Sequence, residues 1–171
     1  LFSLFPVEVL AAEPEMTITV GSVEVTASDT DVKIPVSVKN ASPVMMMGLE
    51  FILPEGLTLK SITVGEVTTA AGARLYNNID AGTVNIEADN NVTFQDGTIL
   101  TLTVDVSSSA SGSLTIKAQP IDNAEGMIAN EDEQVVPVTF VPGTITVKGS
   151  TDERTVKFMN GTAEVNSYTV I

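Results

Sequence analysis

Two acidic stretches near the end of the main apolar pattern carry the side chains best suited to chemistry. They are Asp122-Asn123-Ala124-Glu125-Gly126 and Glu131-Asp132-Glu133. Carboxylate and carbonyl oxygens are the ligands that calcium prefers. Ala124, however, stands where the EF-hand spacing requires a second oxygen ligand, so solvated loops are favoured over a calcium site. No metal site and no cofactor are predicted for the chain.

The residues that are missing exclude most other chemistry. The 171 residues include no Cys, no His and no Trp. Disulfides, thiolate or imidazole metal ligands, and Ser–His–Asp or Cys–His nucleophile pairs are therefore excluded. Strand parity also brings no pair of carboxylates together in a cleft, as glycoside hydrolysis would need. We predict that the chain is not an enzyme.

The charge balance narrows the range of partners. There are 8 Lys and Arg against 22 Asp and Glu, which gives a formal net charge of −14. Nucleic acids and anionic membrane surfaces are bound by patches of Lys and Arg. We therefore predict neither nucleic-acid binding nor direct membrane contact.

The elements that position any site are predicted to be strands. Val, Thr and Ile number 23, 21 and 12, about a third of the chain, and these residues pack well on pleated sheets. Apolar residues alternate with polar ones in many windows, such as 32–38 and 100–106, and no window has a convincing helical period. The pattern predicts an all-β, two-sheet β-sandwich of about nine strands, and leaves jelly-roll and immunoglobulin-like topologies open. Pro35 predicts an edge or a bulge in its strand.

Composition divides the chain into three parts. Residues 1–15 begin with an apolar run and are interpreted as a signal-peptide remnant or an N-terminal arm, which implies export. Residues 16–149 form the sandwich. Residues 150–171 are interpreted as a linker and the start of a following β module, with a hairpin around Asn160-Gly161. A hairpin packed on the main domain is the alternative.

Five segments in order carry a family resemblance: 18–21, 32–38, 48–57, 96–106 and 143–147. Together they resemble the cohesin domain of bacterial cellulosome-type scaffolding proteins, over about residues 16–148. The resemblance implies a nine-stranded jelly roll that binds dockerin modules of secreted enzymes acting on plant polysaccharides. It also implies a monomeric module within a multidomain chain, secreted or at the cell surface of a bacterium, with calcium on the dockerin partner. The sequence departs from the common family pattern at Leu53-Pro54-Glu55, and it has Gly48 and Glu50 where Asn and Asp are frequent.

The resemblance also implies a binding site, on a sheet formed by strands eight, three, six and five. From strand parity, the residues predicted to contact a partner are Met46, Gly48, Glu50, Ile52, Tyr76, Asn78, Glu87, Asp89 and Lys117, with Arg74, Asn85, Thr115 and Gln119 beside them. Ile52 and Tyr76 are expected to contribute desolvation energy. Glu50, Glu87 and Asp89 are expected to pair with Lys, Arg or hydroxyl groups of the partner. A slip of one residue would instead expose Val84, Ile86 and Ala88.

Two other functions remain open for a β-sandwich of this composition. A carbohydrate-binding module would stack sugars on exposed aromatic rings, and the absence of Trp together with only two Tyr disfavours it. A structural module of a surface adhesin needs no binding site at all.

Overall fold

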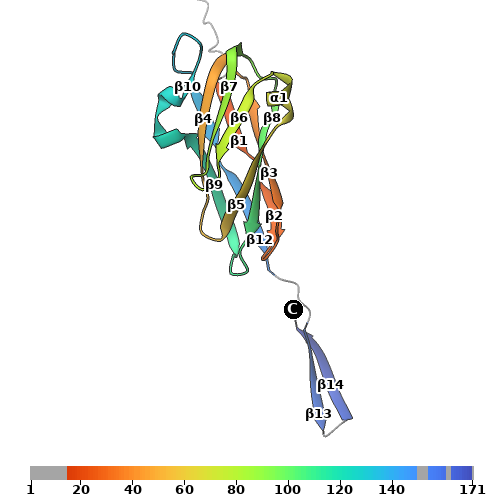
Figure 1. The fold of residues 1–171 in the computed structure, drawn as a ribbon. Coiled ribbons are helices and arrows are strands. Elements are labelled where there is room, and N and C mark those ends of the chain that lie inside the picture. Colours follow the sequence, from red (N-terminus) through yellow and green to blue (C-terminus); the bar gives the residue numbers. More distant parts are fainter. Residues whose placement is uncertain (1–14, 150–153, 161–162, 171) are drawn as a thin grey trace, which may run out of the picture.

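The described part of the chain is a sandwich of two sheets with a separate hairpin. The computed structural model describes residues 15–149, 154–160 and 163–170. Residues 15–149 form two sheets packed face to face (Figure 1). This confirms the predicted all-β, two-sheet sandwich. The predicted N-terminal arm, apart from Glu15, and residues 150–153 of the predicted linker lie outside the described residues.

The first sheet has five strands, in the order β11-β1-β3-β8-β5. Their bounds are β1 Met16–Val20, β3 Val32–Lys39, β5 Leu57–Val64, β8 Gly97–Val106 and β11 Val138–Val141. All neighbours run antiparallel except β1 and β11, which run parallel.

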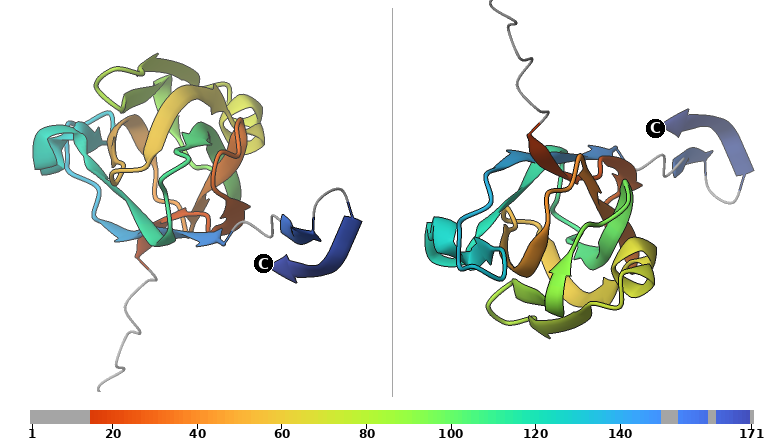
Figure 2. Two further views of the ribbon diagram at one scale, coloured as in Figure 1. Left: turned by 90° about the horizontal axis from the view of Figure 1, so that it is seen from below. Right: turned by 90° about the horizontal axis from the view of Figure 1, so that it is seen from above.

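The second sheet has seven strands, in the order β2-β12-β9-β4-β7-β6, with β10 paired to β4. Their bounds are β2 Val23–Thr26, β4 Val44–Ile52, β6 Arg74–Asn78, β7 Thr83–Val92, β9 Gly112–Pro120, β10 Ile128–Ala129 and β12 Gly143–Lys148. Seen along the strands, the two sheets enclose one core (Figure 2).

Alternation along the strands builds that core. In β1, Met16, Ile18 and Val20 are buried and the Thr residues between them are half-buried. The same parity buries Leu49 and Phe51 on β4 and Leu102 and Val104 on β8. Because each strand has one apolar side, the inner sides of the two sheets must meet to exclude water.

One short helix departs from the predicted all-strand reading. Helix α1 spans Glu66–Ala70 and packs Val67 and Thr68 beside β8. The Thr68 hydroxyl donates a 2.7 Å hydrogen bond to the Ile99 carbonyl oxygen. A helix of five residues is too short to show a helical period, so the sequence pattern could not predict it.

The strand count differs from prediction, and of the two alternatives predicted for Pro35, an edge or a bulge, the structure has a register shift beside it and no edge. Residues 15–149 contain twelve strands rather than about nine, mainly because β10 and β11 were not foreseen. Strands of two and four residues are too short to show clear alternation. Pro35 lies on β3, inside its sheet and not at an edge, although the β3–β8 register shifts close by, between Val36 and Ser37.

Strands β13 (Arg154–Asn160) and β14 (Ala163–Val170) pair antiparallel with each other. They form a two-stranded sheet of their own, as expected for a hairpin around Asn160. No described helix is long and apolar enough to span a membrane.

An ion-pair network on the first sheet predicts a pH dependence of stability. Lys60 Nζ donates to Asp31 Oδ1 at 2.9 Å and lies 3.4 Å from Asp105 Oδ1. The hydrogen bond from Lys60 and its charge lower the pKa of Asp31, and the bond to Asp31 raises the pKa of Lys60. The Asp31 contribution is therefore lost as pH falls through its lowered pKa, below about pH 4. The Lys60 contribution is lost as pH rises through its raised pKa, above about pH 10.

We therefore expect Asp31→Asn to lower the urea midpoint at pH 7 and to leave it unchanged at pH 2. Circular dichroism at both pH values measures this, with Glu55→Gln as an exposed control. An equal loss at pH 2 would show that Asp31 acts through something other than its charge.

Candidate functional site

Strands β9, β4, β7 and β6 are neighbours in that order in the seven-stranded sheet, as the resemblance implied for strands eight, three, six and five. We call their outward side the binding face. Strand register aligns its residues in rows: Tyr76, Asn85 and Gly48; then Asn78, Thr83, Glu50 and Gln119; then Ile52 and Lys117.

The register of β7 decides which side chains reach this face. Val84 and Ile86 are 1% and 2% exposed and belong to the core. Asn85, between these two residues, and Glu87, directly after Ile86, are half-buried on the opposite side, and Asp89 is exposed. The predicted parity is therefore confirmed, and the one-residue slip does not occur.

The structure brings the nine predicted contact residues onto one face with different degrees of exposure. Ile52, Tyr76, Asn78, Asp89 and Lys117 are exposed, Met46, Glu50 and Glu87 are half-buried, and Gly48 is buried. Arg74 and Thr115 beside them are exposed, whereas Asn85 and Gln119 are half-buried. Their role in binding stays a prediction.

Gly48, predicted to contact a partner, is covered by its own chain in this structure. Residues 121–127 form two 3₁₀ turns, η1 (Ile121–Asn123) and η2 (Glu125–Met127), beside β4. A Cβ placed on Gly48 would lie 2.8 Å from Met127 Cε and 3.2 Å from Ile121 Cδ1. Met127 and Ile121, both half-buried, therefore cover the face at this position.

These two residues belong to the candidate site, and sequence reasoning missed them. They lie in an acidic loop with no apolar period, so nothing in the sequence marked them as surface contacts. β10 anchors the segment from its far end, because Ile128 and Ala129 pair with Met47 and Met46 of β4.

Asn85 carries an unsatisfied polar atom beneath this cover. Its Oδ1 is buried and accepts no hydrogen bond within residues 15–149, and it would lie 3.0 Å from a Cβ on Gly48. A buried acceptor without a donor costs about 1–3 kcal/mol. The centre of the binding face therefore holds a buried acceptor without a donor, close to the Met127 side chain.

Ile52 and Tyr76 supply the exposed apolar surface. Their side chains are 44% and 52% exposed. They lie two strands and four residues apart, which at about 4.8 Å per strand and 3.4 Å per residue separates them by roughly 16 Å. The face thus presents two separate apolar anchors, with the Glu50 row between them.

Most charged groups on the face already have partners within the chain. Arg74 forms an ion pair with Asp89, and the hydrogen bond to Asp89 raises the pKa of Arg74. Gln119 Nε2 donates to Glu50 Oε2 at 2.9 Å. In the free chain Asp89 is thus paired with Arg74, and its predicted pairing with Lys, Arg or hydroxyl groups of a partner stays a prediction.

The acidic loops gather no metal site within the described residues. No three Asp or Glu side chains of that part come together in a way that could hold a metal ion. Glu131 instead ties its loop to the end of β7: its backbone N–H donates to Asn91 Oδ1 at 2.8 Å, and its carboxylate accepts from Asn91 N at 3.4 Å.

Comparisons with known proteins agree with this architecture. The family model described as the cohesin domain matches residues 16–163. A non-cellulosomal cohesin from the hyperthermophilic archaeon Archaeoglobus fulgidus superposes with a TM-score of 0.60 at 22% identity, covering 81% of this chain and 94% of that one. The third ScaB cohesin of R. flavefaciens, solved with a group 1 dockerin, gives 0.64 at 19% identity, with coverages of 81% and 99%.

A third similar structure is the third cohesin of ScaC from Acetivibrio cellulolyticus, solved with the ScaB dockerin. Its TM-score is 0.62 at 19% identity, and the match covers 77% of this chain and 98% of that one. No curated protein matches the chain. Because the family model covers most of the 171 residues, the chain belongs to the cohesin domain family.

Proposed function

We propose that this chain captures dockerin modules on the binding face. Two observations support the proposal. Cohesins of the same fold have been solved in complex with dockerins. In this chain, the four strands β9, β4, β7 and β6 present exposed apolar side chains among groups that form hydrogen bonds.

The chemistry of the face suits a protein partner. Ile52 and Tyr76 are exposed in the free chain, so their burial against a partner removes apolar surface from water. Glu50 is held by Gln119, which fixes its carboxylate before binding and limits the entropy lost on association. Lys117 and the Arg74–Asp89 pair are exposed and should act mainly on association rate and specificity.

Met127 is a third apolar contact in this proposal. Its thioether lies over Gly48 and can change rotamer at low cost, since Met is unbranched and flexible. A partner that moves it aside could donate a hydrogen bond to Asn85 Oδ1.

We further propose a scaffolding role without catalysis. Cohesin domains are non-catalytic binding modules, and this sequence has no His or Cys. The captured proteins would be secreted enzymes that degrade polysaccharides, and the parent chain would be secreted or displayed at the surface of a bacterium. Calcium would belong to the dockerin. Residues 150–171, whose hairpin forms its own sheet, would be a linker and the start of a following module.

A carbohydrate-binding role is not favoured. Sugar-binding platforms use exposed aromatic rings, and Tyr76 is the single exposed aromatic side chain within residues 15–149. One ring 52% exposed offers a single stacking position, which is little for an extended polysaccharide.

Calcium removal tests the proposal. The full chain, immobilised, is exposed to the secreted proteins of its source organism, and retained proteins are identified by mass spectrometry. We expect the retained proteins to carry dockerin modules, and we expect chelation of calcium by EDTA to release them. The urea midpoint of the chain itself should not change with EDTA, because the calcium is expected on the partner.

Retention in EDTA and the urea midpoint distinguish a wrong calcium assignment from a wrong function. If dockerin proteins stay bound in EDTA, the dockerin does not need calcium to bind, and the calcium part of the proposal is wrong. If no dockerin protein is retained while the midpoint shows a folded chain, the proposed function is wrong although the fold is right.

A further inference from the structure

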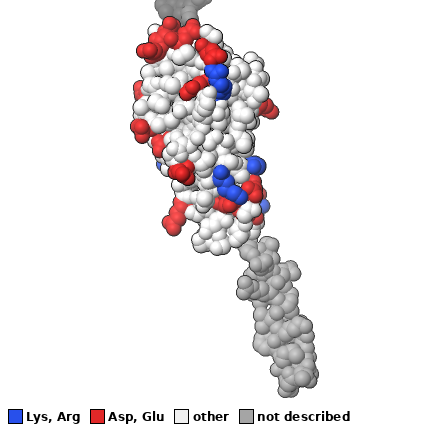
Figure 3. All heavy atoms as spheres, in the orientation of Figure 1, with Lys and Arg blue, Asp and Glu red and all other residues white. Residues whose placement is uncertain are grey.

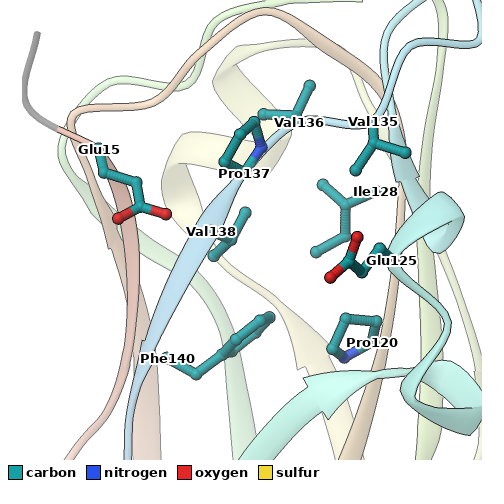
Figure 4. Close-up of a pocket in the computed structure, with 9 residues that line it drawn as sticks. All are labelled: Glu15, Pro120, Glu125, Ile128, Val135, Val136, Pro137, Val138 and Phe140. Atoms are coloured by element: carbon teal, nitrogen blue, oxygen red, sulfur yellow. The ribbon is translucent and has the colours of Figure 1, made fainter.

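A cavity of about 210 Å³ lies at the flank of the sandwich, apart from the binding face. Strands β1 and β11 bound it on one side, and β10, η2 and the end of β9 bound it on the other (Figure 4). We propose that this cavity is a docking site for a Lys or Arg side chain of an extended peptide segment from a partner protein. The proposal does not depend on dockerin capture.

Most of the side chains that line the cavity are apolar. Ile128 forms its floor and is 1% exposed, and Phe140, Pro137 and Pro120 surround it. The volume admits one long side chain rather than a second strand. Lys and Arg pack their methylene stems along such surfaces while their charged heads stay near water or an anion.

Two acidic residues line the cavity, Glu15, just before β1, and Glu125, on η2. Figure 4 shows the Glu125 carboxylate directed toward the cavity. One oxygen of Glu15 accepts a 2.8 Å hydrogen bond from the Thr139 hydroxyl, which orients the group and leaves its second oxygen free of that bond. Neither carboxylate is among the ion pairs formed within residues 15–149.

The negative charge around the cavity favours a positively charged side chain as its occupant. The formal net charge of −14 leaves few cations in the chain to compete for these carboxylates. Figure 3 shows acidic side chains gathered at the end of the sandwich where β1 begins, with few Lys or Arg atoms among them. A guanidinium or ammonium group with an apolar stem matches both the wall and the carboxylates.

The neighbouring strand favours a peptide over a free amino acid. β11 is the last strand of its sheet and pairs on one side only, with β1. A strand with an unpaired edge can pair with an extended segment through backbone hydrogen bonds. Phe140 of this strand lines the cavity, so a segment running along β11 can insert a side chain there.

Residues 1–14 of the same chain are the competing occupant, because they lead directly into Glu15. They contain Glu8 and Glu13 and no Lys or Arg. Two further carboxylates beside Glu15 and Glu125 would be repelled rather than attracted.

Titration of the isotope-labelled full chain, followed by NMR, tests the proposal. The probe is the capped pentapeptide Thr-Val-Arg-Val-Thr, and the comparison peptide has the neutral isostere citrulline in place of Arg. We expect the Arg peptide to shift the amide signals of Ile128, Val138 and Phe140, with at least about 10-fold weaker binding of the citrulline peptide. Glu125→Gln and Glu15→Gln should each weaken binding of the Arg peptide several-fold, and Glu133→Gln, on an exposed loop, should not.

Several outcomes would overturn the site. They are equal binding of the two peptides, signal shifts confined to the binding face, or equal effects of Glu125→Gln and Glu133→Gln. Nuclear Overhauser contacts between residues 1–14 and Phe140 in the free chain would assign the cavity to the chain's own N-terminal segment instead. Because Gln keeps the size of Glu, unchanged urea midpoints would show that each variant folds.

Discussion

Ile52→Arg is expected to weaken dockerin binding by at least about 30-fold, which corresponds to about 2 kcal/mol. The side chain is 44% exposed at the end of β4, so the substitution leaves the core intact. In the complex, the Arg side chain would place a charge at a position where apolar surface is expected to be buried. It also sets that charge opposite Lys117, the cross-strand neighbour, so the two cations repel each other.

Two milder substitutions distinguish the effect of losing apolar contact from the effect of adding a charge. Ile52→Ala and Tyr76→Ala remove apolar area without adding charge, and each should weaken binding by roughly 10-fold. The two side chains are roughly 16 Å apart by strand spacing and share no contact, so the double variant should show additive losses in binding free energy. Isothermal titration with a purified dockerin that the chain captures measures all three variants.

Val141→Arg is the matched control for Ile52→Arg. Val141 is 40% exposed on β11, in the other sheet, so the same substitution is made at similar exposure away from the binding face. Its affinity for dockerin should equal that of the parent chain. If Ile52→Arg binds as tightly as Val141→Arg, the binding face is wrongly assigned.

Gly65→Ala is expected to destabilise the fold by about 3 kcal/mol or more. Gly65 precedes α1, and its N–H donates a 2.8 Å hydrogen bond to the Ile99 carbonyl oxygen. A Cβ there would lie 2.5 Å from the Ile99 carbonyl carbon and closer still to the Thr98 carbonyl oxygen. These are backbone atoms of β8, whose Ile99 and Leu100 are fully buried, so relief of the clash must move a central strand.

Two other glycines provide the comparison. In Gly48→Ala the new methyl would meet the flexible ends of Met127, Asn85 and Ile121, so we expect a loss of about 1 kcal/mol. Gly126 has no atom near its Cβ position, and Gly126→Ala should be close to neutral. Urea denaturation followed by circular dichroism ranks the three. A Gly65→Ala midpoint equal to that of Gly126→Ala would contradict the close approach of α1 and β8.

Much of the binding face could be predicted from the sequence because strand parity is a local property. Successive side chains of a strand point to opposite sides, so the sequence puts Val84 and Ile86 on one side and Glu87 and Asp89 on the other without knowledge of any other strand. The burial of Val84 and Ile86 in the structure then excludes the one-residue slip. The neighbour relation of β9, β4, β7 and β6 came from the family resemblance and not from periodicity. No local pattern states which strands pair when the connections between them are long.

By itself, the amino-acid sequence determined the all-β class, the inward side of each long strand, and the absence of Cys and His chemistry. The tertiary structure alone decided that Met127 covers Gly48, that Arg74 engages Asp89, and that Glu15 and Glu125 line one cavity. The physical reason is separation along the chain. Gly48 and Met127 are far apart in sequence and meet because β10 pairs with β4, and Glu15 and Glu125, also far apart, line the same cavity because β11 pairs with β1. Alternation depends on adjacent residues, whereas such contacts depend on how whole strands are ordered within the two sheets.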